Sequence, residues 1–155
     1  MSSVGSVPPS AGTGAGRHNV FVYGTLLENE IVGVLLKRVP PSSPAVLHGY
    51  QRFSIKGCSY PAIIPVENKK VDGKVLLGIT DIELGIFDVF EDFEYERRSS
   101  GTLLAYTYVW VEKDDPKLEG DWDFNAWREQ HLEEFLEVVE KFIEEYVAAE
   151  PNAPL

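Results

Sequence analysis

The sequence predicts an α+β domain in which closely spaced strands form a sheet that curls or closes, with two short helices and one long C-terminal helix. Three observations predict it. Residues 44–80 contain three β-rich runs in quick succession, residues 103–112 are aromatic and β-branched, and residues 124–147 repeat apolar side chains at helical spacing. With 155 residues and 44% hydrophobic composition, the chain is long enough for about one domain with a substantial core.

The first predicted strand covers residues 20–23, where apolar residues follow one another without alternation, as in a strand buried on both faces. It stops at Gly24 and Thr25. A strand that ends in a glycine turn can present free backbone amides to an anionic or carbonyl oxygen. The same residues also fit an ordinary tight turn, and both interpretations stay open at this point. A short helix is predicted over residues 29–36, before Pro40 and Pro41.

The β-rich segment 44–80 is divided by turn-forming residues, which we expect at Gly57, Pro61, Pro65 and the turn Asp72-Gly73. Thr80 followed by Glu83 forms a capping box and predicts a helix over residues 81–90. The expected apolar stripe of this helix consists of Ile82, Ile86, Val89 and Phe90.

The last helix is predicted over residues 124–147 and is expected to end before Pro151. Its apolar stripe should consist of Trp127, His131, Phe135, Val138, Phe142 and Tyr146. The acidic back of this helix fits a solvated face, or alternatively a docking surface for a basic partner. Residues 1–18 are expected to be a disordered leader, with a transit peptide as a second interpretation; residues 19–149 form the domain, and residues 150–155 a flexible tail.

The formal charge of −11 is concentrated in residues 112–150, which carry fourteen acidic and four basic side chains. A phosphate backbone would be repelled, so nucleic acid is a poor candidate partner. No apolar run approaches the roughly 18 residues of a membrane span, and no membrane association is expected.

One cysteine, Cys58, excludes an intramolecular disulfide and fits a reducing compartment such as the cytoplasm. We expect it to be a small buried apolar residue. His18, His48 and His131 are scattered over three segments without ligand spacing, so no metal site is predicted.

The segment "FDVFEDFEYERR", residues 87–98, offers a candidate catalytic carboxylate. If the chain extends after the helix, Glu91 shares a face with Phe93, Tyr95 and Arg97, whereas the other acids share the opposite face. Burial and the C-terminal end of the helix would both raise the pKa of Glu91 from about 4.3 toward the range of a general base. An ion pair with Arg97 would oppose that shift.

The motifs "VYGTLL", "GCSYPAI" and "FEDFEYERR", in this order, resemble those of the γ-glutamylcyclotransferase-like family. The segment "KDDPKLEGDWDFNAW" and the acidic helix are similar to the plant branch of avirulence-induced-gene-2-like (AIG2-like) proteins. The resemblance spans about residues 19–147. It implies a small mixed fold around a strongly curved, barrel-like β-sheet, with a pocket roofed by the loop after the first strand.

Carried over by motif, the resemblance implies Glu91 as the catalytic acid/base. It implies a substrate loop of Tyr23, Gly24, Thr25, Leu26, Leu27 and Glu28, and supporting roles for Tyr60, Pro61, Tyr95 and Arg97. The implied reaction is intramolecular acyl transfer on a small γ-glutamyl compound, which releases 5-oxoproline and an amine or amino acid. No cofactor is required for such a reaction.

Residues 98–106 depart from the family pattern, because relatives commonly place a further valine-rich strand there; we expect a shortened or missing hairpin. This departure favours a second interpretation, a non-catalytic binding or stress-response module that keeps the pocket. A third interpretation, thiol redox chemistry at Cys58, has less support because no second cysteine could resolve an oxidised thiol.

Overall fold

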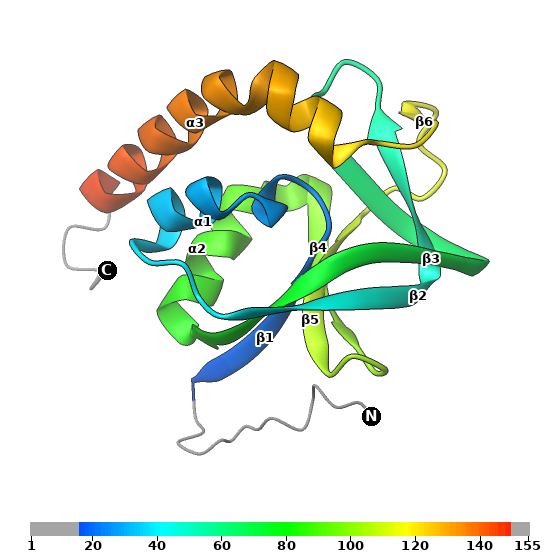
Figure 1. The fold of residues 1–155 in the computed structure, drawn as a ribbon, viewed down its shortest axis with the longest axis horizontal. Helices are drawn as coiled ribbons and strands as arrows, with labels where there is room; N and C mark the ends of the chain where they lie inside the picture. The colour runs from blue at the N-terminus through cyan, green and yellow to red at the C-terminus, as the bar shows by residue number, and fades with distance from the viewer. Residues whose placement is uncertain (1–15, 150–155) are drawn as a thin grey trace.

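The computed structural model describes residues 16–149 (Figure 1). Most of the expected leader, the expected tail and Pro151 lie outside the described residues. The leader was expected to reach residue 18, but Arg17 and His18 belong to the first strand. The helices are α1 (Asn29–Leu36), α2 (Asp81–Glu91) and α3 (Phe124–Ala149). The strands are β1 (Arg17–Val22), β2 (Ser42–Ile55), β3 (Pro61–Thr80), β4 (Tyr95–Ser100), β5 (Ala105–Trp110) and β6 (Leu118–Glu119).

The strands form one curled six-stranded sheet in the order β4-β5-β1-β3-β2-β6. Neighbouring strands are antiparallel except β1 and β5, which are parallel. The three helices gather on one side of the sheet, and α3 lies across α1 (Figure 1). The predicted α+β class with a strongly curved sheet is confirmed.

Strand β1 is covered on both faces, as predicted. Val20 and Val22 pack in the core between the sheet and the helices, whereas Phe21 and Tyr23 pack in a second cluster with side chains of β2, β3 and β5. Because the sheet curls, it buries both faces of its central strand. This explains the unbroken apolar run at residues 20–23.

The prediction of three short runs in residues 44–80 is wrong, because the segment forms only two long strands, β2 and β3. Their ribbon bends at a register shift between His48 and Tyr50, where Gly49 adopts φ +86°. Pro65 lies within β3, and the turn predicted at Asp72-Gly73 does not exist.

Gly73 instead marks a close approach between strands. It pairs with Ala45 of β2, and its neighbour Lys74 pairs with Val22 of β1. A Cβ atom on Gly73 would lie 2.2 Å from the carbonyl oxygen of Val22 and 2.8 Å from the Phe21 ring. The glycine is therefore needed for lack of space rather than for a turn.

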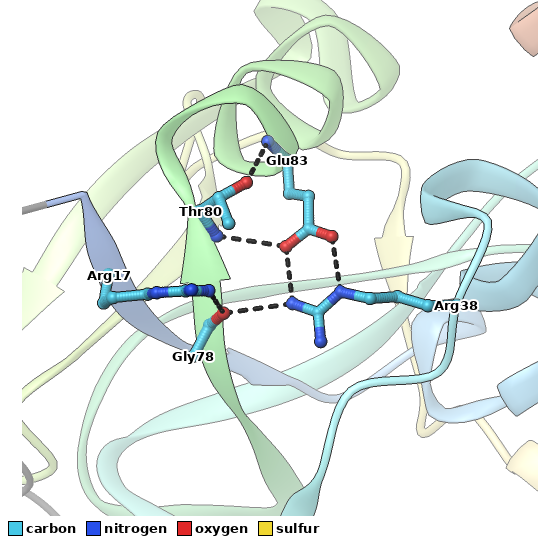
Figure 2. A network of polar contacts seen from close by, with 5 residues as sticks. All are labelled: Arg17, Arg38, Gly78, Thr80 and Glu83. Carbon is cyan, nitrogen blue, oxygen red and sulfur yellow. Dashed lines mark hydrogen bonds and ion pairs between the residues drawn. The ribbon is translucent and has the colours of Figure 1, made fainter. Parts of the chain in front are cut away.

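Helix α2 begins with the predicted capping box, in which the Thr80 hydroxyl accepts from the Glu83 amide and the Glu83 carboxylate accepts from the Thr80 amide. Arg38 adds a bidentate ion pair to Glu83, at 2.6 and 2.7 Å, and also donates to the Gly78 carbonyl, which Arg17 reaches as well (Figure 2). Burial would raise the pKa of Glu83, but the bonds from Arg38 and Thr80 outweigh it and hold that pKa below its usual value. The network fixes the start of α2.

The predicted stripe of α2 is only partly correct. Ile86 is fully buried, but Ile82 and Val89 are 40% and 52% exposed. Leu84 and Phe87 are buried in their place. The stripe is rotated because α2 packs against both β1 and β3, as well as α1.

The predicted long helix is confirmed, since α3 begins at Phe124 and continues past residue 147. Its buried side chains are Trp127, Val139 and Ile143, whereas Val138 is 59% exposed. Within residues 16–149 no helix is apolar over a length that would cross a membrane.

Two further expectations are corrected. The hairpin is not missing, because β4 and β5 pair from Tyr95 with Trp110 to Ser100 with Ala105. Cys58 is exposed rather than buried, because it lies in the turn between β2 and β3. The linker before α3 also contains β6, which extends the sheet beyond β2 and was not predicted.

Candidate active site

A cavity of about 230 Å³ opens where the end of β1, the end of α2 and the side of α3 meet. Its lining comes from five separate stretches of the chain. The lining residues are Phe21, Val22, Tyr23, Gly24, Thr25, Leu26, Tyr60, Pro61, Phe90, Glu91, Asp92, Glu94, Tyr95, Tyr108, Phe135 and Val138. A pocket of this size is just below the roughly 300–1,000 Å³ typical of drug-sized ligands and suits a smaller molecule.

Glu91 is the last residue of α2 and lines this cavity. Its side chain is partly buried, and burial raises its pKa to about 8. A carboxyl group with such a pKa exchanges its proton near neutral pH, as a general acid or base must. Arg97, which could have opposed this shift, pairs with Asp88 at 3.1 Å instead.

Tyrosine side chains surround Glu91. Burial, with the negative charge of Glu91 as a further cause, raises the pKa of Tyr23, Tyr95 and Tyr108. These hydroxyls donate elsewhere: Tyr23 to the Tyr108 carbonyl at 2.6 Å, Tyr95 to the Pro61 carbonyl at 2.7 Å, and Tyr108 to Asp88 at 2.6 Å. Each of these hydroxyl groups already donates its proton in a hydrogen bond. The lone pairs of the hydroxyl oxygens can still accept hydrogen bonds.

Gly24 is required by the close approach of Pro61. A Cβ atom on Gly24 would lie 2.8 Å from Pro61 Cγ and 2.9 Å from Cδ. Next to it, a single turn of 3-10 helix (Thr25–Leu27) begins. The amides of Leu27 and Glu28 donate to the carbonyls of Gly24 and Thr25, whereas within residues 16–149 those of Thr25 and Leu26 donate to no protein acceptor. Two backbone donors therefore remain available where the loop lines the cavity.

Leu27 and Glu28 do not line the cavity, unlike the other four residues of the predicted substrate loop. The Leu27 carbonyl accepts from Lys74 at 3.1 Å, and Glu28 is buried in an ion pair with Arg128 at 2.5 Å. At the other end of the loop, Arg52 donates to the Tyr23 carbonyl at 3.0 Å. Cations from β2, β3 and α3 thus hold the loop in place.

The predicted supporting residues divide in the same way. Tyr60, Pro61 and Tyr95 line the cavity, whereas Arg97 does not. Arg97 holds Asp88, which accepts the hydroxyl of the lining residue Tyr108. Arg97 therefore contacts the cavity only through two other side chains.

The segment after Glu91 does not extend as predicted. Asp92 adopts φ +62° and ψ −164°, and Phe93 is 83% exposed rather than on the same face as Glu91. This backbone region is essentially restricted to glycine and costs on the order of 1–3 kcal/mol for other residues. Such strain beside a titratable group is typical of functional sites.

Sequence reasoning did not find four lining residues outside the motifs, namely Phe21, Tyr108, Phe135 and Val138. All four belong to predicted strands or helical stripes, where a side chain that faces a cavity has the same sequence pattern as one that faces the core. Among the described residues, no cluster of three or more side chains could hold a metal ion.

The curled sheet and the cavity lined by the Gly24 loop and Glu91 fit what the resemblance to the γ-glutamylcyclotransferase-like family implied, and comparison with known proteins shows the family. The model of the family described as "Gamma-glutamyl cyclotransferase, AIG2-like" matches residues 20–124, so the chain belongs to this family.

The relatives include AIG2-like protein D of Arabidopsis thaliana, which is 50% identical over 137 residues, covering 83% of this chain and 90% of that protein. Two solution structures of Arabidopsis thaliana proteins share the fold. One has a TM-score of 0.62 and 39% identity, covering 84% of this chain and 93% of that chain. The other has a TM-score of 0.61 and 45% identity, covering 84% of each.

Proposed function

We propose that this protein is a γ-glutamylcyclotransferase that releases 5-oxoproline from a small γ-glutamyl compound. The observation that carries the proposal is the placement of Glu91: a carboxyl group with a pKa of about 8 lines the same cavity as Gly24, Thr25 and Leu26, and within residues 16–149 the amides of Thr25 and Leu26 donate to no protein acceptor. The family to which the chain belongs supports the reaction type.

In the proposed mechanism, the Glu91 carboxylate takes one proton from the α-ammonium group of the substrate. The freed amine attacks the γ-carbonyl carbon of the same molecule and forms the new C–N bond of the five-membered ring. Glu91 then gives this proton to the leaving nitrogen as the original amide bond breaks, and the ring nitrogen passes its second excess proton to the departing amine, which leaves as an ammonium group. Atoms and charge balance without a cofactor, and the products are 5-oxoproline and a free amine or amino acid.

The remaining groups of the cavity would bind and orient. The amides of Thr25 and Leu26 are proposed donors to the oxyanion that develops on the γ-carbonyl, and the lone pairs of Tyr23 and Tyr95 are proposed acceptors for the ammonium group. Because the two reacting groups belong to one molecule, holding the bent conformer supplies much of the acceleration. Leu27, Glu28 and Arg97 are proposed to position the loop and Tyr108.

The first test uses the full chain and a panel of γ-glutamyl amino acids and γ-glutamyl amines, with 5-oxoproline measured by chromatography. At least one compound is expected to be converted, with one equivalent of amine or amino acid released per 5-oxoproline. Calorimetric binding of panel members without any turnover would overturn the proposal and support the binding-module interpretation. The β4–β5 hairpin is present, so the sheet does not lack the strand whose loss would have favoured that alternative.

The role of the loop predicts the effect of Gly24→Ala. The added methyl group would overlap Pro61 and push the loop from its position, so kcat/KM should fall by about tenfold or more, as small displacements of a positioned group do. The matched control is Gly33→Ala in α1, where the new Cβ would meet only Val39 at an ordinary 3.5 Å. Equal kcat/KM values for the two variants would refute the assigned role of Gly24.

A further inference from the structure

One wall of the cavity comes from α3, through Phe135 and Val138. The family match ends at residue 124, and α3 begins at Phe124. This wall is therefore contributed by a helix that follows the matched region, while Glu91 and the loop lie within it.

The α3 wall is apolar. Phe135 packs edge-on against Phe90, which also lines the cavity, with ring centroids 6.2 Å apart at 83°. Val138 is 59% exposed although it lines the cavity, so the cavity meets solvent beside it. An exposed valine next to two phenylalanine rings offers a contact surface for an apolar group.

The charges of the cavity have one sign. Its described lining contains Glu91, Asp92 and Glu94, and no lysine or arginine. A carboxylate on the leaving group would find no lysine or arginine in that lining and would be repelled by Asp92 and Glu94, whereas Glu91 is mostly protonated at pH 7. An uncharged apolar leaving group meets neither penalty.

The wall is held in a fixed position. Trp127 and Val139 of α3 are almost completely buried, and Arg128 pairs with Glu28 at the end of the substrate loop. Phe135 also packs edge-on against Trp127, with centroids 5.5 Å apart. A rigid apolar wall can discriminate between leaving groups because it need not be ordered on binding.

We infer that Phe135 and Val138 are specificity-determining residues, and that they select γ-glutamyl compounds whose leaving nitrogen bears an apolar group without a carboxylate. The inference rests on the proposed function. If the polar groups around Glu91 hold the glutamyl half, the apolar wall of α3 is left to contact the leaving half.

Three compounds test this inference: γ-glutamyl-phenethylamine, γ-glutamyl-ethylamine and γ-glutamyl-phenylalanine. γ-Glutamyl-phenethylamine has an aromatic ring that γ-glutamyl-ethylamine lacks. It differs from γ-glutamyl-phenylalanine only in lacking the carboxylate of the leaving group. The kcat/KM for γ-glutamyl-phenethylamine is expected to exceed each of the other two by about tenfold, the size of a modest apolar or charge contribution.

Val138→Ser is the main variant, because an exposed valine can be replaced at little cost to folding. It should lower the ratio of kcat/KM values for γ-glutamyl-phenethylamine and γ-glutamyl-ethylamine by about threefold to tenfold. Phe135→Leu, which keeps an apolar side chain in the helix, should lower the same ratio. The control is Glu140→Gln on the exposed face of α3, for which the ratio should stay at the wild-type value.

Similar kcat/KM values for the three compounds, or a ratio that Val138→Ser does not change, would overturn the inference and leave the proposed function intact. Turnover of none of the compounds would overturn the proposed function. In that case, binding of the same compounds is measured by calorimetry. If γ-glutamyl-phenethylamine binds more tightly than the other two and Val138→Ser weakens its binding, the α3 wall is still a selective surface. Any other binding result contradicts that role of the wall.

Discussion

Replacing Glu91 by glutamine is expected to lower kcat/KM for 5-oxoproline release by about 10² to 10⁴, the usual contribution of a general acid or base. Glutamine has nearly the same shape as glutamate but cannot take the ammonium proton. The matched control is Glu96→Gln, which removes the same charge from an exposed side chain of β4 that pairs with Arg98 outside the cavity. Circular dichroism should show the same fold in both variants.

The pH profile distinguishes a proton-transfer role of Glu91 from a structural one. Because the pKa of Glu91 is about 8, only about a tenth of the free enzyme carries the carboxylate at pH 7. The kcat/KM of the wild-type protein should therefore rise about tenfold per pH unit below pH 8 and then level off. The residual activity of Glu91→Gln should lack this rise. An unchanged profile in the variant would assign the proton to another group.

The same pKa shift affects stability, with a definite sign. The folded state holds the Glu91 proton up to about pH 8, whereas the unfolded chain releases it near its ordinary value of 4.5. The wild-type protein thus loses stability as pH rises through this window, at no more than about 1.4 kcal/mol per pH unit. Glutamine does not titrate, so in urea titrations the stability of Glu91→Gln relative to wild type should increase from pH 5 to pH 8.

Gly73→Ala should be among the most destabilising single substitutions in this protein, lowering the free energy of unfolding by about 3 kcal/mol or more. The new Cβ atom would lie 2.2 Å from the Val22 carbonyl oxygen, an atom of the central strand that cannot rotate away. Either β1 or β3 would have to shift, and the substrate loop follows β1 directly.

The control for Gly73→Ala is Gly85→Ala, since a Cβ atom at Gly85 would meet nothing within 4 Å. Gly85 lies inside α2, where alanine favours the helix by up to about 1 kcal/mol. Urea denaturation should give opposite signs for the two substitutions. A Gly73→Ala variant as stable as wild type would show that β1 and β3 can separate at this point without cost.

The elements predicted correctly are those whose signals are local. Helix α1 covers residues 29–36 as predicted, the capping box of Thr80 and Glu83 starts α2, and α3 begins at the predicted Phe124. Each depends on capping, proline placement or spacing within a few residues. The turn predicted at Asp72-Gly73 was wrong because the same dipeptide occurs both in turns and in strands where a neighbouring strand leaves no room for a side chain.

The candidate site was predicted in part for the same reason. The family motifs pointed to Glu91, Gly24 and Pro61, which line one cavity. The predicted face with Phe93 and Arg97 failed because Asp92 takes a positive φ, which alternation along a strand cannot anticipate. The motif also included Leu27 and Glu28, which anchor the loop from outside the cavity.

By itself, the sequence determined the helices, the buried central strand and the two halves of the candidate site, because caps, apolar spacing and short motifs act over a few residues. Only the tertiary structure decided that β3 passes so close to β1 that Gly73 has no room for a side chain, and that Phe135 and Val138 of α3 line the same cavity as Glu91. These contacts join residues distant along the chain. The curl of the sheet and the packing of α3 bring them together.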